Sequence, residues 1–221
     1  MLDVTPPNPP WIPFVPREHS GAALSYYYSD PNSTIPVREV TRADDNKADP
    51  NMETMTYGMF TTCERGMRAG MVRDGRPYIF FCTNRGGRRV LTGYYLIGWY
   101  CKGPPIKGYR RAGGSVPHDY ILAASRMKFV DPGFPLTQLT PYLGRKRVDT
   151  PFRTFRYIDS EMARLLRELI DGTPDATESY LGEIRRLEKL NLAKYGYRYR
   201  NWKREEGFTW SAAPPFLGIE Q

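Results

Sequence analysis

Two aromatic runs joined by a glycine turn constrain the fold of this chain more than any other feature. Residues 78–84 read YIFFCTN and residues 90–101 read VLTGYYLIGWYC, with RGGRR between them. Aromatic and β-branched residues favour strands, and glycine supplies the positive φ angles that a tight hairpin turn needs. The sequence therefore predicts a β-hairpin whose second strand is long and bends at Gly93 and Gly98.

Further strands are expected on both sides of this hairpin. Residues 53–62 form a strand candidate before it, and residues 68–77 read as a turn-rich connection. A basic loop at residues 102–118 leads to a strand at residues 119–130, and residues 134–139 form the last strand. Short strands separated by turn residues are typical of small sandwiches and barrels, so this segment predicts a β-rich unit.

Two amphipathic helices are predicted in residues 158–196. Apolar residues of the first helix recur at helical spacing up to Gly172, and Thr173 with Pro174 reads as the start of the second. So short a connection predicts that the two helices pack as an antiparallel hairpin. The apolar positions are Ile158, Met162, Leu165, Leu166, Leu169 and Ile170 in the first helix, and Tyr180, Leu181, Ile184, Leu187 and Leu190 in the second.

The two ends of the chain have their own patterns. Proline crowds residues 1–16 and predicts an extended arm, because it fixes φ and lacks a backbone N–H. The aromatic residues among these prolines favour an arm that packs on its own domain, and a partner-docking segment is the alternative. Residues 194–204, KYGYRYRNWKR, alternate tyrosine with arginine, which favours a strand with packed tyrosines and exposed arginines.

Charge and motifs narrow the range of functions. The net charge of +8 favours an anionic partner such as nucleic acid. Cys63, Cys82 and Cys101 include no CxxC pair, which is typical of a reduced, cytoplasmic protein with buried thiols. No signal peptide, membrane span, nucleotide-binding glycine motif or metal-ligand spacing is recognised, so no membrane partner, cofactor or metal is expected. A nucleophilic pair of Cys63 and His118 is less favoured than a structural thiol, so no catalytic residue is assigned.

Three segments occur in the order seen in one superfamily. They are YIFFCTN after a glycine-containing turn, the strand TGYYLIGWY, and SRMKFVDPGFPL with its Ser-x-x-Phe and Pro-Leu pattern. In this order, residues 53–140 resemble the PUA-like superfamily of small β-barrels, which includes the EVE, ASCH, YTH and SRA-type domains. The pattern departs from an idealised Gly-Asp at DGRP, residues 74–77.

The resemblance implies the barrel, and together with the proline-rich start and the helical spacing it predicts an α+β fold with three parts. Residues 1–51 are expected to be an extended proline-rich arm and linker. Residues 52–145 are expected to form a PUA-like β-barrel, and residues 146–221 a helical hairpin with a basic, aromatic tail. The resemblance also implies a pocket between barrel strands that takes in a single base, often a modified one.

Base capture needs an aromatic face for stacking and polar groups for the base edge. Because strand ends meet at a barrel mouth, we expect the side chains there to bind the base and the basic loops to bind phosphates. The base-binding set is Thr61, Thr62, Asn84, Trp99, Tyr100, Ser125 and Arg126. The phosphate-binding set is Arg85, Arg88, Arg89, Lys102, Lys107, Arg110 and Arg111.

The sequence therefore predicts a non-catalytic nucleic-acid-binding protein, with DNA, RNA and the oligomeric state left open. Three of the base-binding residues also have a structural interpretation. Trp99 also fits in a hydrophobic core, Asn84 in a turn, and Ser125 in a hydrogen bond to the backbone. One alternative is an enzyme acting on nucleic acid or nucleotides that uses Cys63, His118 or a threonine. The other is a protein-interaction module that uses the arm and the helical hairpin.

Overall fold

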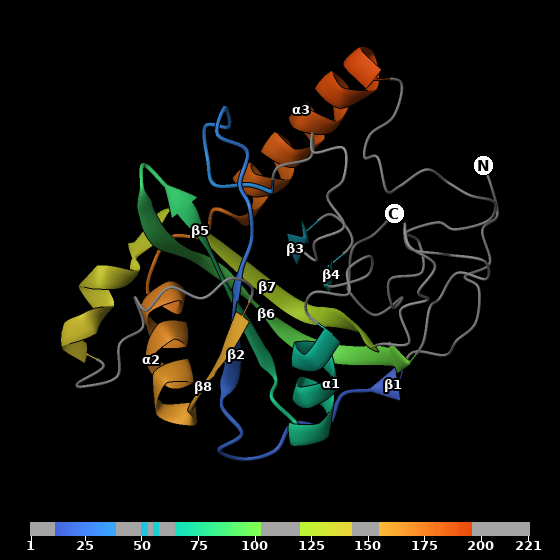
Figure 1. Cartoon of the computed structure of the whole chain (residues 1–221), viewed down its shortest axis with the longest axis vertical. Helices are drawn as coiled ribbons and strands as arrows, with labels where there is room; N and C mark the ends of the chain where they lie inside the picture. Colours follow the sequence, from blue (N-terminus) through green and yellow to red (C-terminus); the bar gives the residue numbers. More distant parts are fainter. Residues whose placement is uncertain are drawn as a thin grey trace.

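Three long antiparallel strands form the centre of the fold, which we describe from a computed structural model (Figure 1). They are β5 (Tyr78–Arg85), β6 (Arg88–Lys102) and β7 (Tyr120–Pro135). The structure describes residues 12–38, 50–52, 55–57, 65–102, 120–142 and 155–195. Within these residues the protein is α+β, as predicted, with a mixed sheet covered by helices on both faces.

The sheet has the order β3-β4-β7-β6-β5-β2-β8, and β1 pairs with the far end of β6. β2 runs parallel to β5 and antiparallel to β8, whereas the other pairs are antiparallel. No described residue pairs β3 with β8, so the closed barrel is not confirmed. The shorter strands are β1 (Ile12–Pro13), β2 (Ala22–Tyr26), β3 (Pro50–Asn51), β4 (Thr56–Tyr57) and β8 (Phe155–Ile158).

The predicted hairpin is confirmed. β5 and β6 pair from Tyr78 with Leu96 to Arg85 with Arg88, and the turn glycines Gly86 and Gly87 have φ angles of 54° and 75°. The ladder between β6 and β7 shifts register beside both Gly93 and Gly98, the positions expected to bend the strand. Cys82 is fully buried, as expected of a structural thiol.

Local structure differs from the sequence prediction at three places. β2 lies in the proposed arm, yet its residues are buried inside the sheet between β5 and β8. Residues expected to form a turn-rich connection form the helix α1 (Arg65–Asp74). The last strand predicted, at residues 134–139, does not form. β7 continues to Pro135, and the short 3-10 helix η2 (Leu136–Tyr142) follows it.

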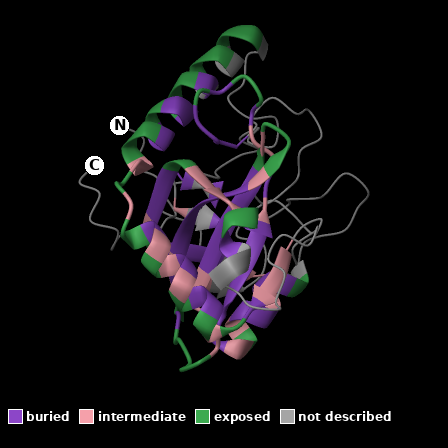
Figure 2. Ribbon diagram, turned by 90° about the vertical axis from the view of Figure 1, so that its left-hand side faces the viewer, coloured by how far each residue is buried: buried purple, intermediate pink, exposed green. Residues whose placement is uncertain are grey.

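The core has two parts, one on each face of the sheet. On the α1/α3 face, Met67 and Met71 of α1 belong to one core cluster with Tyr180 and Ile184 of α3 (Thr177–Tyr195). On the opposite α2/η2 face, α2 (Ser160–Asp171) and η2 cover the strands. Figure 2 looks at the side that carries α2 and η2, and buried residues gather in the central strands behind the exposed outer turns. The sheet is thus enclosed by apolar contacts on both sides.

Two helices form in the predicted region, but Ile158, expected in the first helix, ends β8, and α2 begins at Ser160. The antiparallel hairpin is not confirmed, since α2 and α3 contribute to different cores. Gly172 ends α2 as expected. α3 begins at Thr177, where Asp175 accepts the backbone N–H of Thr177, and not at the predicted Thr173. Leu190, expected in the apolar face, is 53% exposed.

Two further expectations lie at or beyond the limits of the described residues. α3 continues to Tyr195, and the predicted strand after it falls outside the described part of the chain. Among the described helices, none is both long and apolar enough to span a membrane.

Candidate functional site

The predicted stacking pair lies at the end of β6, where the two rings have different surroundings. Tyr100 packs against the α1/α3 core, with its ring 6.4 Å from that of Phe14 and 5.6 Å from that of Tyr120. Trp99 and Tyr100 are both half-buried. Tyr100 is the ring that packs against the α1/α3 core, so Trp99 is the stacking candidate on the other side of the strand.

Register places Trp99 on the α2/η2 face. It pairs with Ala123, whose neighbours Leu122 and Ala124 both point into the α1/α3 core. Because side chains alternate along a strand, and direct cross-strand partners share a face, Ala123 and Trp99 point to the opposite side. On that same face, Leu96 pairs with Arg126 of β7 and with Tyr78 of β5.

Ser125 and Arg126 lie on β7 beside the part of β6 that leads to Trp99, and Arg126 pairs with Leu96. Ser125 occupies a bulge, where its hydroxyl donates to the backbone oxygen of Leu96 at 3.2 Å. A Cβ on Gly98 would lie 2.6 Å from the Cβ of Ser125, so this close approach requires glycine. Arg126 is 61% exposed and lies 3.8 Å from the carboxylate of Asp171.

Asn84 does not join this group. It pairs with Arg89 beside the hairpin turn, and its backbone oxygen accepts a hydrogen bond from Ser29. From Arg89 to Trp99 the chain covers about 30 Å of strand. In an antiparallel hairpin, the end of the first strand lies beside the start of the second, which is why these two strand ends do not meet.

The hairpin arginines are only partly available to phosphates. Arg85 donates to the backbone oxygen of Thr34 at 2.6 Å, and the Arg89 guanidinium lies 4.8 Å from the ring centre of Tyr26. Arg88 is exposed. Lys102 is the last residue of β6. The other predicted binding residues lie outside the described residues, and so do the enzyme candidates Cys63 and His118. These binding residues are Thr61, Thr62, Lys107, Arg110 and Arg111.

A basic pocket that sequence reasoning missed lies on the α2/η2 face. Its volume is about 140 Å³, and it is formed by residues 17–21, the start of β5, and one side of α2. Three arginines line it, together with a histidine and three hydroxyl residues, and none of its lining residues is acidic. The arginines are Arg17, Arg164 and Arg167, and the hydroxyl residues are Ser20, Tyr78 and Ser160. Such a lining favours an anionic ligand.

Hydrogen bonds orient two of these arginines. Nη1 of Arg167 donates to the Tyr78 hydroxyl at 3.4 Å, and this bond is the main cause of a raised Arg167 pKa. Nη1 of Arg164 donates to both carboxylate oxygens of Glu168, at 2.9 and 2.8 Å. The guanidinium groups are therefore positioned at the pocket, with Glu168 offsetting part of the Arg164 charge.

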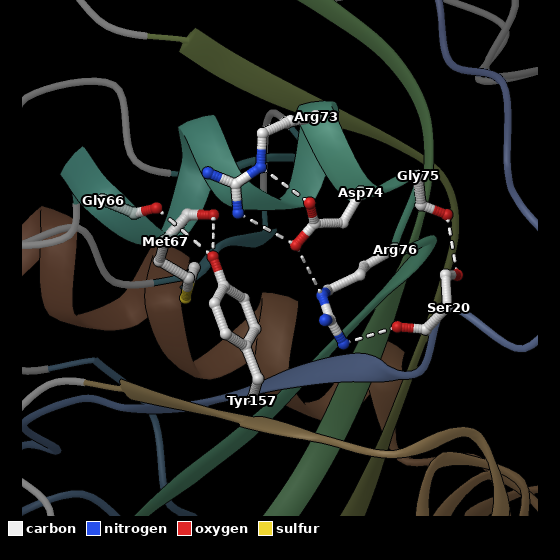
Figure 3. Close-up of polar contacts among 8 residues, drawn as sticks. All are labelled: Ser20, Gly66, Met67, Arg73, Asp74, Gly75, Arg76 and Tyr157. Carbon is white, nitrogen blue, oxygen red and sulfur yellow. Dashed lines mark hydrogen bonds and ion pairs between the residues drawn. The ribbon is translucent and has the colours of Figure 1, made fainter.

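The loop that carries Arg17 is fixed to the end of α1 (Figure 3). The backbone N–H of Arg17 and the hydroxyl of Ser20 both donate to the backbone oxygen of Gly75, at 3.0 and 2.9 Å. Arg76 donates to the backbone oxygen of Ser20 at 2.5 Å. These contacts set the path of residues 17–21 along the pocket, so Arg17 starts from a fixed backbone position.

A second set of contacts holds Arg76 in place (Figure 3). Its guanidinium lies 4.4 Å from the ring centre of Tyr157, and its Nε lies 3.4 Å from the carboxylate of Asp74. The hydrogen bond from Arg73 lowers the pKa of Asp74, with a smaller contribution from Arg76. The Tyr157 hydroxyl donates to the backbone oxygen of Met67 at 3.0 Å, and burial raises its pKa. α1, β8 and the pocket loop thus support one another.

Asp171 connects the pocket with the surroundings of Trp99. Its carboxylate accepts a 2.7 Å hydrogen bond from the Tyr94 hydroxyl, and it lies 3.8 Å from Arg126 and 4.0 Å from Arg167. Burial, followed by this hydrogen bond, raises the pKa of Tyr94. Lys128 donates to the backbone oxygen of Asp171 at 2.9 Å. The end of α2 is therefore fixed against β6 and β7.

The pocket residues, Arg126 and Trp99 lie on the same side of the sheet, and we call this set of residues the basic face. It consists of Arg17, Tyr78, Trp99, Arg126, Arg164 and Arg167. No three His, Cys, Asp or Glu side chains in the described ranges group as metal ligands. Comparisons of the chain with protein-family models, with curated proteins and with solved structures find no match.

Proposed function

We propose that this protein binds nucleic acid through the basic face, stacking one base on Trp99 and holding phosphates with arginine, without a catalytic step of its own. The observation that carries the proposal is the position of the half-buried Trp99 on the same side of the sheet as Arg126 and the arginine-lined pocket. Aromatic stacking contributes about 1–3 kcal/mol per base. Arginine suits phosphate because its planar guanidinium donates two parallel hydrogen bonds.

The spacing of these groups supports a single bound strand. Trp99 lies three residues beyond Leu96, and Leu96 pairs with Tyr78 at the pocket. Three residues of strand cover about 10 Å. Adjacent nucleotides of a stacked strand lie about 3.4 Å apart, so a short oligonucleotide reaches both the indole and the pocket.

Base recognition is the finer part of the proposal. Trp99 supplies the stacking surface, and Ser125 with Arg126 supplies polar groups for the base edge. Asn84 is too far along the hairpin to contribute. The strand order from β5 to β7 is compatible with the PUA-like resemblance. We propose in addition that residues 53–140 close around a modified base, as that resemblance implies.

Fluorescence anisotropy with short single-stranded DNA and RNA, unmodified and carrying modified bases, tests the proposal. We expect Trp99→Ala to weaken binding about tenfold, the equivalent of one lost stacking contact. Arg126→Gln should reduce the slope of log K against log salt by about 0.7. Leu190→Ala, which removes an exposed apolar side chain from α3, serves as the control. Absence of binding at low salt to every oligonucleotide would refute the proposal.

A further inference from the structure

The arginine-lined pocket is a small, open hollow of about 140 Å³, and loop residues 17–21, the start of β5 and one side of α2 line it. We infer that it binds a terminal phosphate monoester, such as the phosphorylated end of an oligonucleotide or a mononucleotide. That the phosphate belongs to an oligonucleotide rests on the proposed function. That the pocket binds a phosphate monoester rests on the chemistry of the pocket alone.

Donors converge on the hollow from different elements. Among the described contacts, the arginines of α2 use only part of their donor sets: Arg164 uses Nη1 on Glu168, and Arg167 uses Nη1 on Tyr78 with Nε near Asp171. Nη2 of each is left for a ligand. The Arg17 guanidinium has no described protein partner. Several guanidinium groups around one small hollow are suited to a compact anion.

The hydroxyl groups add to this donor set. The Tyr78 hydroxyl accepts its hydrogen bond from Arg167, so its own proton remains available to donate. Ser160 lines the pocket at the first residue of α2, where the helix dipole favours negative charge. A phosphate monoester carries more terminal oxygens and more charge than a phosphodiester, so it makes fuller use of these groups.

Carboxylates reduce the positive charge without reversing it. Glu168 and Asp171 each lie beside one arginine of α2, but neither lines the pocket. Asp159 caps α2, and its carboxylate accepts the backbone N–H of Met162 at 2.9 Å. The lining therefore keeps an excess of guanidinium groups over carboxylates, which is the balance that a phosphate dianion requires.

Matched oligonucleotides that carry a phosphate on one end, on the other end, or on neither test this inference with the full chain. We expect one phosphorylated form to bind at least about tenfold more tightly than the hydroxyl form, since hydrogen bonds to charged groups are the strong ones. Arg17→Gln and Arg164→Gln should each remove most of this preference. Arg185→Gln, a change of the same charge on the exposed side of α3, should keep it. Thermal unfolding checks that each variant is folded.

Adenosine monophosphate and adenosine, compared by calorimetry, separate the two sources of the phosphate. Tighter binding of the monophosphate, lost in Arg17→Gln, supports the pocket even if no oligonucleotide binds and the proposed function fails. If oligonucleotides bind equally with and without the terminal phosphate, and adenosine monophosphate binds no more tightly than adenosine, the inference is overturned and the proposed function is left intact. Retention of the phosphate preference by both arginine variants also overturns it.

Discussion

The backbone N–H of Arg17 donates a 3.0 Å hydrogen bond to the carbonyl oxygen of Gly75, joining the N-terminal segment to the end of α1. Gly75 has a φ angle of +66°, a conformation that glycine adopts without the penalty of a side chain. A Cβ at this position would lie 2.6 Å from Cγ and 2.9 Å from the backbone N of Arg17. Gly75 is therefore needed both for its turn and for the position of the pocket loop.

Gly75→Ala is expected to destabilise the protein by about 1–3 kcal/mol, because it adds strain and displaces Arg17. Gly86→Ala is the matched control, since Gly86 also has a positive φ, 54°, but no atom within 4 Å of an added Cβ. Urea unfolding gives both free energies. Equal losses in the two variants would show that the contact with Arg17 contributes nothing.

The segment after β2 is held by a buried acid of α3, and this predicts a pH dependence. Glu183 is 8% exposed and accepts hydrogen bonds from Arg186 and Ser33. The bond from Arg186 is the main reason that its pKa falls from 4.5 to about 2. Because the folded-state pKa is lowered, this stabilisation is present above about pH 5 and is lost as the pH falls toward 2.

Glu183→Gln should therefore remove part of the acid sensitivity of the unfolding free energy. The part that it removes should be on the order of 2 kcal/mol between neutral pH and about pH 2. Chemical denaturation at a series of pH values measures it. Glu178→Gln, on the exposed side of the same helix, should leave the pH profile unchanged. An unaltered profile for Glu183→Gln would contradict the assignment.

Gly98 and Ser125 provide a test of how the strand bend positions Trp99. Gly98→Ala places a Cβ 2.6 Å from that of Ser125, so we expect a loss of about 1–3 kcal/mol in stability and weaker oligonucleotide binding. Ser125→Gly removes the opposing side chain. The double variant should recover most of the loss, which a double-mutant cycle measures as a coupling energy. Additive effects would mean that the two positions do not interact.

Phe14 tests whether the N-terminal segment belongs to the core of its own domain. Its side chain is 8% exposed and its backbone N–H donates to Gly98 at 2.8 Å. Phe14→Ala should cost about 3–5 kcal/mol of unfolding free energy. The neighbouring Val15 is 76% exposed, so Val15→Ala should change stability by less than about 0.5 kcal/mol. Similar small effects for both would favour the alternative that this segment docks a partner.

Local sequence signals predicted the elements that form from neighbouring residues. The β5–β6 hairpin follows from its aromatic runs and its Gly-Gly turn, and α2 follows from its apolar spacing and from Gly172. α1 was missed because Gly66 and Gly70 weaken its helix propensity, although Met67 and Met71 have helical spacing. The spacing of these two methionines is the helical signal that the segment offers.

Elements that depend on distant partners were not predictable. β2 is a strand because β5 and β8 pair with its two edges, and its own sequence follows a proline-rich segment. The pocket brings Arg17 beside Arg164 and Arg167, which lie far away in the sequence. Trp99, Ser125 and Arg126 lie on neighbouring strands because β6 and β7 pair directly. Asn84 was misplaced because the antiparallel register was not considered.

Asp171 should have opposite effects on stability and on binding. It accepts the hydrogen bond of Tyr94 and lies near Arg126 and Arg167 on the basic face. Asp171→Asn should lower the unfolding free energy by about 1–2 kcal/mol, because a charged acceptor is lost. It should also tighten oligonucleotide binding by about two- to fivefold at low salt, because one negative charge is removed from the binding surface. Glu168→Gln, which changes an exposed acid beside Arg164, should tighten binding with little change in stability. Unchanged binding by both variants, measured by anisotropy, would mean that nucleic acid does not contact this side of α2.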